Sequence, residues 1–118
     1  MGEGMKRDAW HIRSDPEQYV LARHWPPRFD VSAVSDFPPV RPSRLARHIR
    51  QDLWRALQGL RGFSPVIQID AAEGGLTVRA GGRLQGRAPQ GTESRIRDLL
   101  DSPAHRARWL RWAGEGRS

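Results

Sequence analysis

The sequence contains no cysteine, and this absence excludes disulfide bonds, thiolate zinc sites and cysteine nucleophiles. No apolar run approaches the roughly 20 residues that a membrane-spanning helix needs. Residues 1–13 lack the apolar core of a secretory signal. We therefore expect a cytoplasmic protein that does not associate with a membrane.

Motifs for catalysis or metal binding are also missing. The four histidines, His11, His24, His48 and His105, show no spacing typical of a metal site. The glycines between residues 80 and 87 lack the Lys-Ser/Thr ending of a phosphate-binding loop, and no serine-nucleophile motif occurs. We therefore expect no catalytic residue, no metal and no cofactor, and we interpret the chain as a non-enzymatic binding protein.

Lysine is nearly missing, because Lys6 is the single lysine among 20 basic residues, and the others are arginine. With 13 acidic residues, the formal net charge is +7. A GC-rich genome also favours arginine over lysine, so the position of the charge is more informative than its amount. Residues 41–64 contain six arginines and one aspartate, a net charge of +5. A charge concentrated in this way indicates an anionic partner.

The length of 118 residues is typical of a single domain. Six prolines punctuate residues 1–42, which predicts an extended N-terminal arm, partly docked on the rest, with one short helix near residues 16–24. Residues 43–113 are predicted to form the core domain, and residues 114–118 a frayed tail. The predicted fold class is α+β.

Within the core domain, residues 43–61 place Leu45, Ile49 and Leu53 on one face, which predicts a long amphipathic helix with Ser43 as its N-cap. Residues 65–88 alternate apolar and polar side chains between glycine turns. This pattern predicts an antiparallel meander of two or three strands, the third over residues 83–88. Residues 92–113 are predicted to form two helices, the second beginning at Ser102 and Pro103.

The polar face of the long helix is the first candidate site, and we expect it to contact nucleic acid. It carries Arg44, Arg47, Arg50 and Arg55, with Trp54 among them. Arginine suits phosphate groups, and a tryptophan beside it can stack on a base. The alternative for Trp54 is burial beneath the N-terminal arm.

Aromatic side chains outside that helix support a second hypothesis, an accessory subunit or regulator that docks on an acidic protein. His105, Trp109 and Trp112 share one face of the last predicted helix, and Trp10 and Trp25 are the expected anchors of the arm. The alternative is that the tryptophans of the last helix close the core. The expected partner is thus nucleic acid or an acidic protein, and the sequence specifies no oligomeric state.

Overall fold

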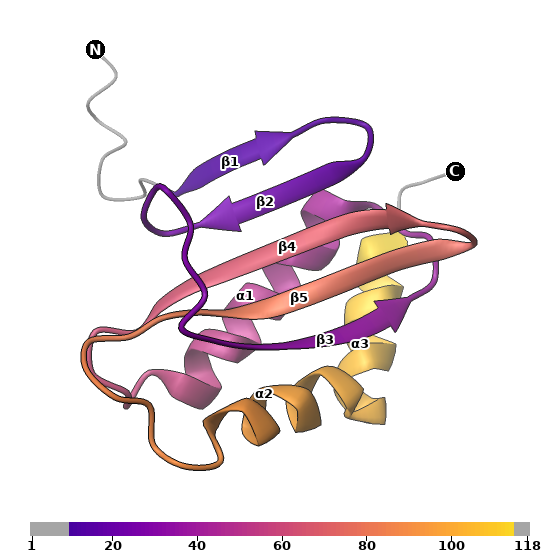
Figure 1. Ribbon diagram of the computed structural model, residues 1–118. Coiled ribbons are helices and arrows are strands. Elements are labelled where there is room, and N and C mark those ends of the chain that lie inside the picture. Colours follow the sequence, from indigo (N-terminus) through magenta and orange to yellow (C-terminus); the bar gives the residue numbers. More distant parts are fainter. Residues whose placement is uncertain (1–9, 115–118) are drawn as a thin grey trace.

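The computed structural model describes residues 10–114, which form an α+β domain with a sheet on one side and helices on the other (Figure 1). The elements in chain order are β1 (His11–Ser14), β2 (Gln18–Ala22), β3 (Val31–Phe37), α1 (Pro42–Leu57), β4 (Ser64–Ala72), β5 (Gly75–Arg83), α2 (Thr92–Asp101) and α3 (Pro103–Gly114). The predicted α+β class is confirmed. None of the described helices is long and apolar enough to cross a membrane.

The five strands form one antiparallel sheet in the order β1-β2-β4-β5-β3. The hairpin of β4 and β5 is central, with Ile67 opposite Ala80. After β2 the chain runs to the far edge of the sheet, where β3 pairs with β5 and Ala33 lies opposite Ala80. The connection over residues 23–30 contains a cis peptide bond between Trp25 and Pro26.

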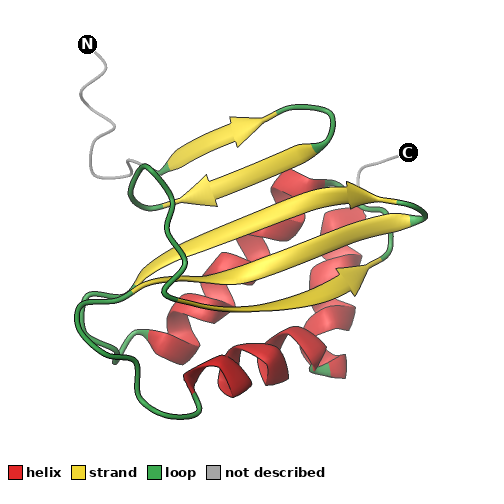
Figure 2. Ribbon diagram, in the orientation of Figure 1, coloured by secondary structure: helices red, strands yellow, loops and turns green. Residues whose placement is uncertain are grey.

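The core lies between the sheet and the three helices, which all lie on the same face (Figure 2). The alternation of β5 points Leu76, Val78 and Ala80 into this core. Burial of Leu45, Ile49 and Leu53 confirms the predicted apolar face of α1. The helix begins at Pro42, however, and its N-cap position is Arg41 rather than Ser43.

The prediction of an extended arm with a short helix near residues 16–24 is wrong. This segment supplies β1, β2 and β3, and residues 18–22 are the buried strand β2. The prolines mark its turns and connections instead, at positions 16, 26, 27, 38 and 39. Proline disfavours the middle of a sheet but fits between strands. Prolines at these positions therefore do not prevent the segment from forming three strands.

The predicted meander is likewise replaced by a different arrangement. Residues 84–88 form no strand, and the third strand beside β4 and β5 on that side is β3. The two predicted C-terminal helices are present, with Pro103 as the first residue of α3. Within the predicted tail, Gly114 ends α3, and residues 115–118 lie outside the described residues.

Candidate functional site

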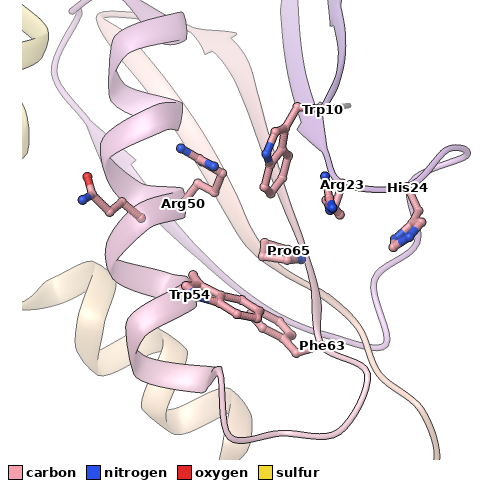
Figure 3. A pocket seen from close by; sticks show the side chains of 8 residues that line it. Trp10, Arg23, His24, Arg50, Trp54, Phe63 and Pro65 are labelled. Atoms are coloured by element: carbon pink, nitrogen blue, oxygen red, sulfur yellow. The ribbon is translucent and has the colours of Figure 1, made fainter. Parts of the chain in front are cut away.

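A cavity of about 520 Å³ lies beside α1, on the side of the helix that faces β2 and β4. Figure 3 shows the Trp54 and Phe63 rings at one end and Trp10 with its two neighbouring arginines at the other. Its lining residues are Trp10, Arg23, His24, Arg50, Gln51, Trp54, Phe63 and Pro65. A volume of this size is typical of sites for small molecules or single chemical groups.

Strand pairing and helical spacing bring these residues together. The backbone N–H of Arg23 donates to the carbonyl of Pro65 at 3.2 Å, which extends the β2–β4 ladder by one residue. Arg50 and Trp54 are four residues apart on α1, so they share one flank of the helix. Phe63 directly precedes β4 and Trp10 directly precedes β1. Residues from four separate stretches of sequence therefore meet here.

The rings of Trp54 and Phe63 form a stacked pair at one end of the cavity. Their centroids are 6.2 Å apart and their planes differ by 10°. Trp54 nevertheless stays 44% exposed, although tryptophan is a side chain that proteins usually bury. This ring therefore offers apolar surface to a planar group that enters the cavity.

The other end of the cavity is cationic. The guanidinium of Arg50 lies 4.5 Å from the centroid of the Trp10 ring, and that of Arg23 lies 5.7 Å from it. Burial lowers the pKa of Arg50, and the charge of Arg47 lowers it further. The Nε atom of Arg50 is buried and has no hydrogen-bond partner among the described residues. This guanidinium is therefore poorly compensated and would be stabilised by an anion.

His24 lies at the mouth of the cavity, where its Nδ1 is 2.6 Å from the Ser64 hydroxyl oxygen. Burial lowers the pKa of His24, and the charges of Arg83, Arg23 and His11 lower it further. The ring is therefore neutral at pH 7. None of the eight lining residues is a carboxylate, so the cavity combines exposed aromatic surface with positive charge alone.

The structure separates the five residues predicted to contact nucleic acid. Arg50 and Trp54 line the cavity, and Arg47 is close enough to Tyr19 for its charge to affect the pKa of that side chain. Arg55 faces the other way and pairs with Asp52 at 3.6 Å, while Arg44 is exposed. Two of the five residues therefore line the cavity, and the other three do not.

Neither prediction for Trp54 describes its surroundings fully. Its ring packs on Phe63, which follows α1, instead of lying beneath an arm. The N-terminal segment still contributes to the site, because Trp10 lines the same cavity. Trp10 was expected to anchor a partner, and the structure places it beside Arg50 instead.

The stripe predicted from His105, Trp109 and Trp112 does not form one surface. Trp109 is fully buried, and its indole N–H donates to Asp52 Oδ2 at 2.7 Å. His105 is half-buried, with its Nδ1 at 2.8 Å from the Ser102 hydroxyl oxygen. Trp112 alone of the three is exposed, at 48%. The spacing was correct, but α3 directs Trp109 into the core, where a large apolar ring is most stable.

Trp25 lies apart from the other predicted partner residues. The centroids of the Trp25 and His11 rings are 6.0 Å apart. The guanidinium of Arg13 lies 5.7 Å from the centroid of the Trp25 ring. His11 and Arg13 pair with Ala22 and Val20, whose side chains lie on the sheet face away from the helices. The five residues predicted to bind a protein are thus distributed over the cavity, the core and two separate surfaces.

Sequence reasoning missed Arg23, His24 and Phe63. The signal was present, because Arg23 and His24 directly follow the apolar run Tyr19–Ala22. Recognising that run as a strand would have placed both residues at the end of a sheet.

The described residues contain no group of three or more histidine or acidic side chains arranged to hold a metal ion. Comparison of the chain with protein-family models, with curated proteins and with solved structures finds no match. The cavity is therefore the feature of the described residues that points to a function.

Proposed function

We propose that this chain is a non-enzymatic module that binds single-stranded nucleic acid and holds one base in the cavity of Trp54. The observation that carries the proposal is the exposed Trp54 ring beside the poorly compensated Arg50, in a cavity without carboxylates. A nucleotide offers both complementary groups, a planar base and a phosphate.

A single strand fits this cavity better than a duplex. The bases of a duplex are stacked and paired, whereas an unpaired base can turn out and stack on an aromatic side chain. Arginine adds both phosphate contacts and cation–π contacts. The proposed contact surface is thus one flank of α1 together with the ends of β2 and β4, and not the outer face of the helix.

The alternative of docking on an acidic protein has less support. It relied on the N-terminal segment and on a continuous tryptophan stripe. The segment is a part of the sheet, and Trp109 is buried. The positive charge suits either partner, but exposed rings within a cavity favour a ligand with flat aromatic groups.

A fluorescence titration with single-stranded oligothymidylate and oligouridylate tests the proposal, using Trp54→Ala and the matched control Trp112→Ala. The two side chains are similarly exposed, at 44% and 48%, but Trp112 does not line the cavity. Stacking on an aromatic ring contributes about 1–3 kcal/mol per base, so Trp54→Ala should weaken binding by roughly 5- to 150-fold.

The control should bind like the wild-type protein and show the same quenching of tryptophan fluorescence. Equal affinity in the wild-type protein and Trp54→Ala, or no binding by the wild-type protein at low salt, would contradict the proposal.

A further inference from the structure

Three loops meet at the end of the sheet next to the cavity. They are the connections over residues 23–30, 58–63 and 84–91, which join β2 to β3, α1 to β4 and β5 to α2 (Figure 1). The N–H of Gln85 donates to the carbonyl of Arg61 at 3.1 Å, and the N–H of Leu84 donates to Asp30 Oδ2 at 2.8 Å. These hydrogen bonds hold the three loops side by side.

Gly62 allows two of these loops to approach closely. A Cβ atom at this position would lie 2.7 Å from the Cβ of Gln85, and the φ angle of Gly62 is +68°. Both features favour glycine over any other residue. The close approach of these two loops therefore requires glycine at position 62.

Two further cavities continue from the first along these loops. The second has a volume of about 300 Å³ and shares His24 with the first, and the third has about 320 Å³ and shares Leu84 and Gln85 with the second. The shared residues make the three cavities neighbours in one series. An extended ligand chain can occupy several neighbouring cavities, whereas a single cavity can hold only one chemical group of it.

Arginines line the whole series. We call these six residues the arginine track: Arg50 and Arg23 in the first cavity, Arg28 and Arg83 in the second, and Arg61 and Arg87 in the third. No carboxylate lines any of the three cavities. Asp30 lies in one of the loops, but its carboxylate already accepts hydrogen bonds from Arg28 and from the N–H of Leu84.

Acidic side chains gather at the opposite end of the sheet. Asp15 and Glu17 flank the turn between β1 and β2, Glu73 lies in the turn between β4 and β5, and Asp36 lies near the end of β3. The loops at that end therefore carry more acidic side chains than the loops beside the cavity. Such a separation of charge directs a polyanion toward the arginine track.

We infer that the ligand is a single-stranded polynucleotide that spans several nucleotides along the arginine track, and not a free mononucleotide. The inference rests on the proposed function, in which one base occupies the cavity of Trp54. One nucleotide would engage the arginines of the first cavity alone, whereas a strand that continues past His24 brings further phosphates to Arg83 and Arg87. Each such contact releases counterions and adds to the salt dependence of binding.

The test measures affinity for a mononucleotide, a dinucleotide, a tetramer and an octamer of thymidylate over a range of salt concentrations. The double variant Arg83→Gln/Arg87→Gln removes the far part of the arginine track. The matched control Arg97→Gln/Arg111→Gln removes the same charge from α2 and α3, at residues that line none of the three cavities.

We expect the affinity of the wild-type protein to rise at each step of the length series. For the octamer, the slope of log affinity against log salt should become shallower by about 1.4 in the track variant, since each phosphate on a single strand contributes roughly 0.7. The control should keep the wild-type slope, and mononucleotide affinity should be the same in all three proteins.

Equal affinity for mononucleotide and octamer, with both bound in the cavity of Trp54, would overturn the arginine track and leave the proposed function standing. An equal loss of octamer affinity in the track variant and the control would also overturn it, because net charge alone would then explain binding. Polyglutamate that binds as tightly as the octamer, and with the same dependence on Arg83 and Arg87, would assign the track to acidic protein segments. Absence of any nucleotide binding would contradict the proposed function itself.

Discussion

Asp52 connects two helices through one buried carboxylate. Its Oδ2 accepts hydrogen bonds from the Trp109 indole N–H, at 2.7 Å, and from the Arg108 guanidinium. This residue lies next to the basic face of α1, yet its role is in the core. It explains why Trp109 can be fully buried although its N–H needs an acceptor.

Replacing Asp52 with alanine should lower the free energy of unfolding by about 1–3 kcal/mol, because the buried N–H of Trp109 loses its acceptor. Asp52→Asn keeps an acceptor and should lose less. Urea unfolding followed by circular dichroism measures both. Wild-type stability in Asp52→Ala would show that this contact does not contribute to stability.

We expect His24 to make the charge at the mouth of the cavity depend on pH. Its pKa is lowered from 6.5, first by burial and then by Arg83, Arg23 and His11, so the folded protein keeps this ring neutral over a wider pH range than the unfolded chain does. As the pH falls through the lowered pKa, His24 gains a positive charge at the mouth of the cavity. Nucleotide affinity should therefore increase, although the same shift costs stability once the pH falls below about 6.5.

Measuring affinity between pH 7 and about pH 5 checks this prediction, with unfolding recorded at each pH to show that the protein remains folded. The matched variant His24→Gln cannot be protonated and should lose most of the increase. The same increase in both proteins would assign it to another group.

At the scale of elements, sequence periodicity predicted helices better than strands. The apolar face of α1 repeats over 16 residues, so local sequence was sufficient to find it. The strands β1 and β2 have four and five residues, and the residues of β3 pair with residues of β5 that lie 39 to 51 positions later in the chain. No local pattern specifies such a partner, and the nearby prolines suggested an arm instead.

The same difference explains which site residues were found. Arg50 and Trp54 were predicted because they lie on one helix. Arg23 and Phe63 become their neighbours only through the pairing of β2 with β4, which the sequence did not reveal. Helical spacing also suggested that His105, Trp109 and Trp112 form a surface, but packing of α3 against α1 buries the middle residue.

A test at this scale is Leu53→Ala in α1. Leu53 is fully buried against the sheet, so the variant should lose about 2–5 kcal/mol of unfolding free energy. Gln58→Ala, at an exposed position just beyond the helix, should change stability little. Similar unfolding midpoints for the two variants would contradict the assignment of the core face.

At the scale of the whole molecule, the sheet depends on its N-terminal strands. The core includes Tyr19 and Leu21 of β2 and Val31, Ala33 and Phe37 of β3. A fragment of residues 43–118 would expose the apolar surfaces that these side chains cover, and it would leave only β4 and β5 of the five strands to pack against the helices. We expect this fragment to show no cooperative thermal transition by circular dichroism, and a cooperative transition would show that the rest of the domain folds without β1, β2 and β3.

The loops beside the cavity carry more positive charge than the loops at the opposite end of the sheet. The loops that carry Arg23, Arg28, Arg61 and Arg87 lie at the end where α1 finishes (Figure 1), and the exposed Trp54 ring stacks on Phe63 of one of these loops. Aromatic surface and positive charge thus coincide at one place on the protein. We therefore expect a base of bound nucleic acid to lie at this place.

Photocrosslinking of an oligonucleotide that contains iodouracil locates the bound base, because the excited base couples to aromatic side chains that it contacts. The crosslinked peptide is then identified by mass spectrometry. We predict attachment at Trp54, Trp10 or Phe63, which line the cavity. Attachment at Trp25 or Trp112, which are exposed to a similar degree elsewhere, would contradict it.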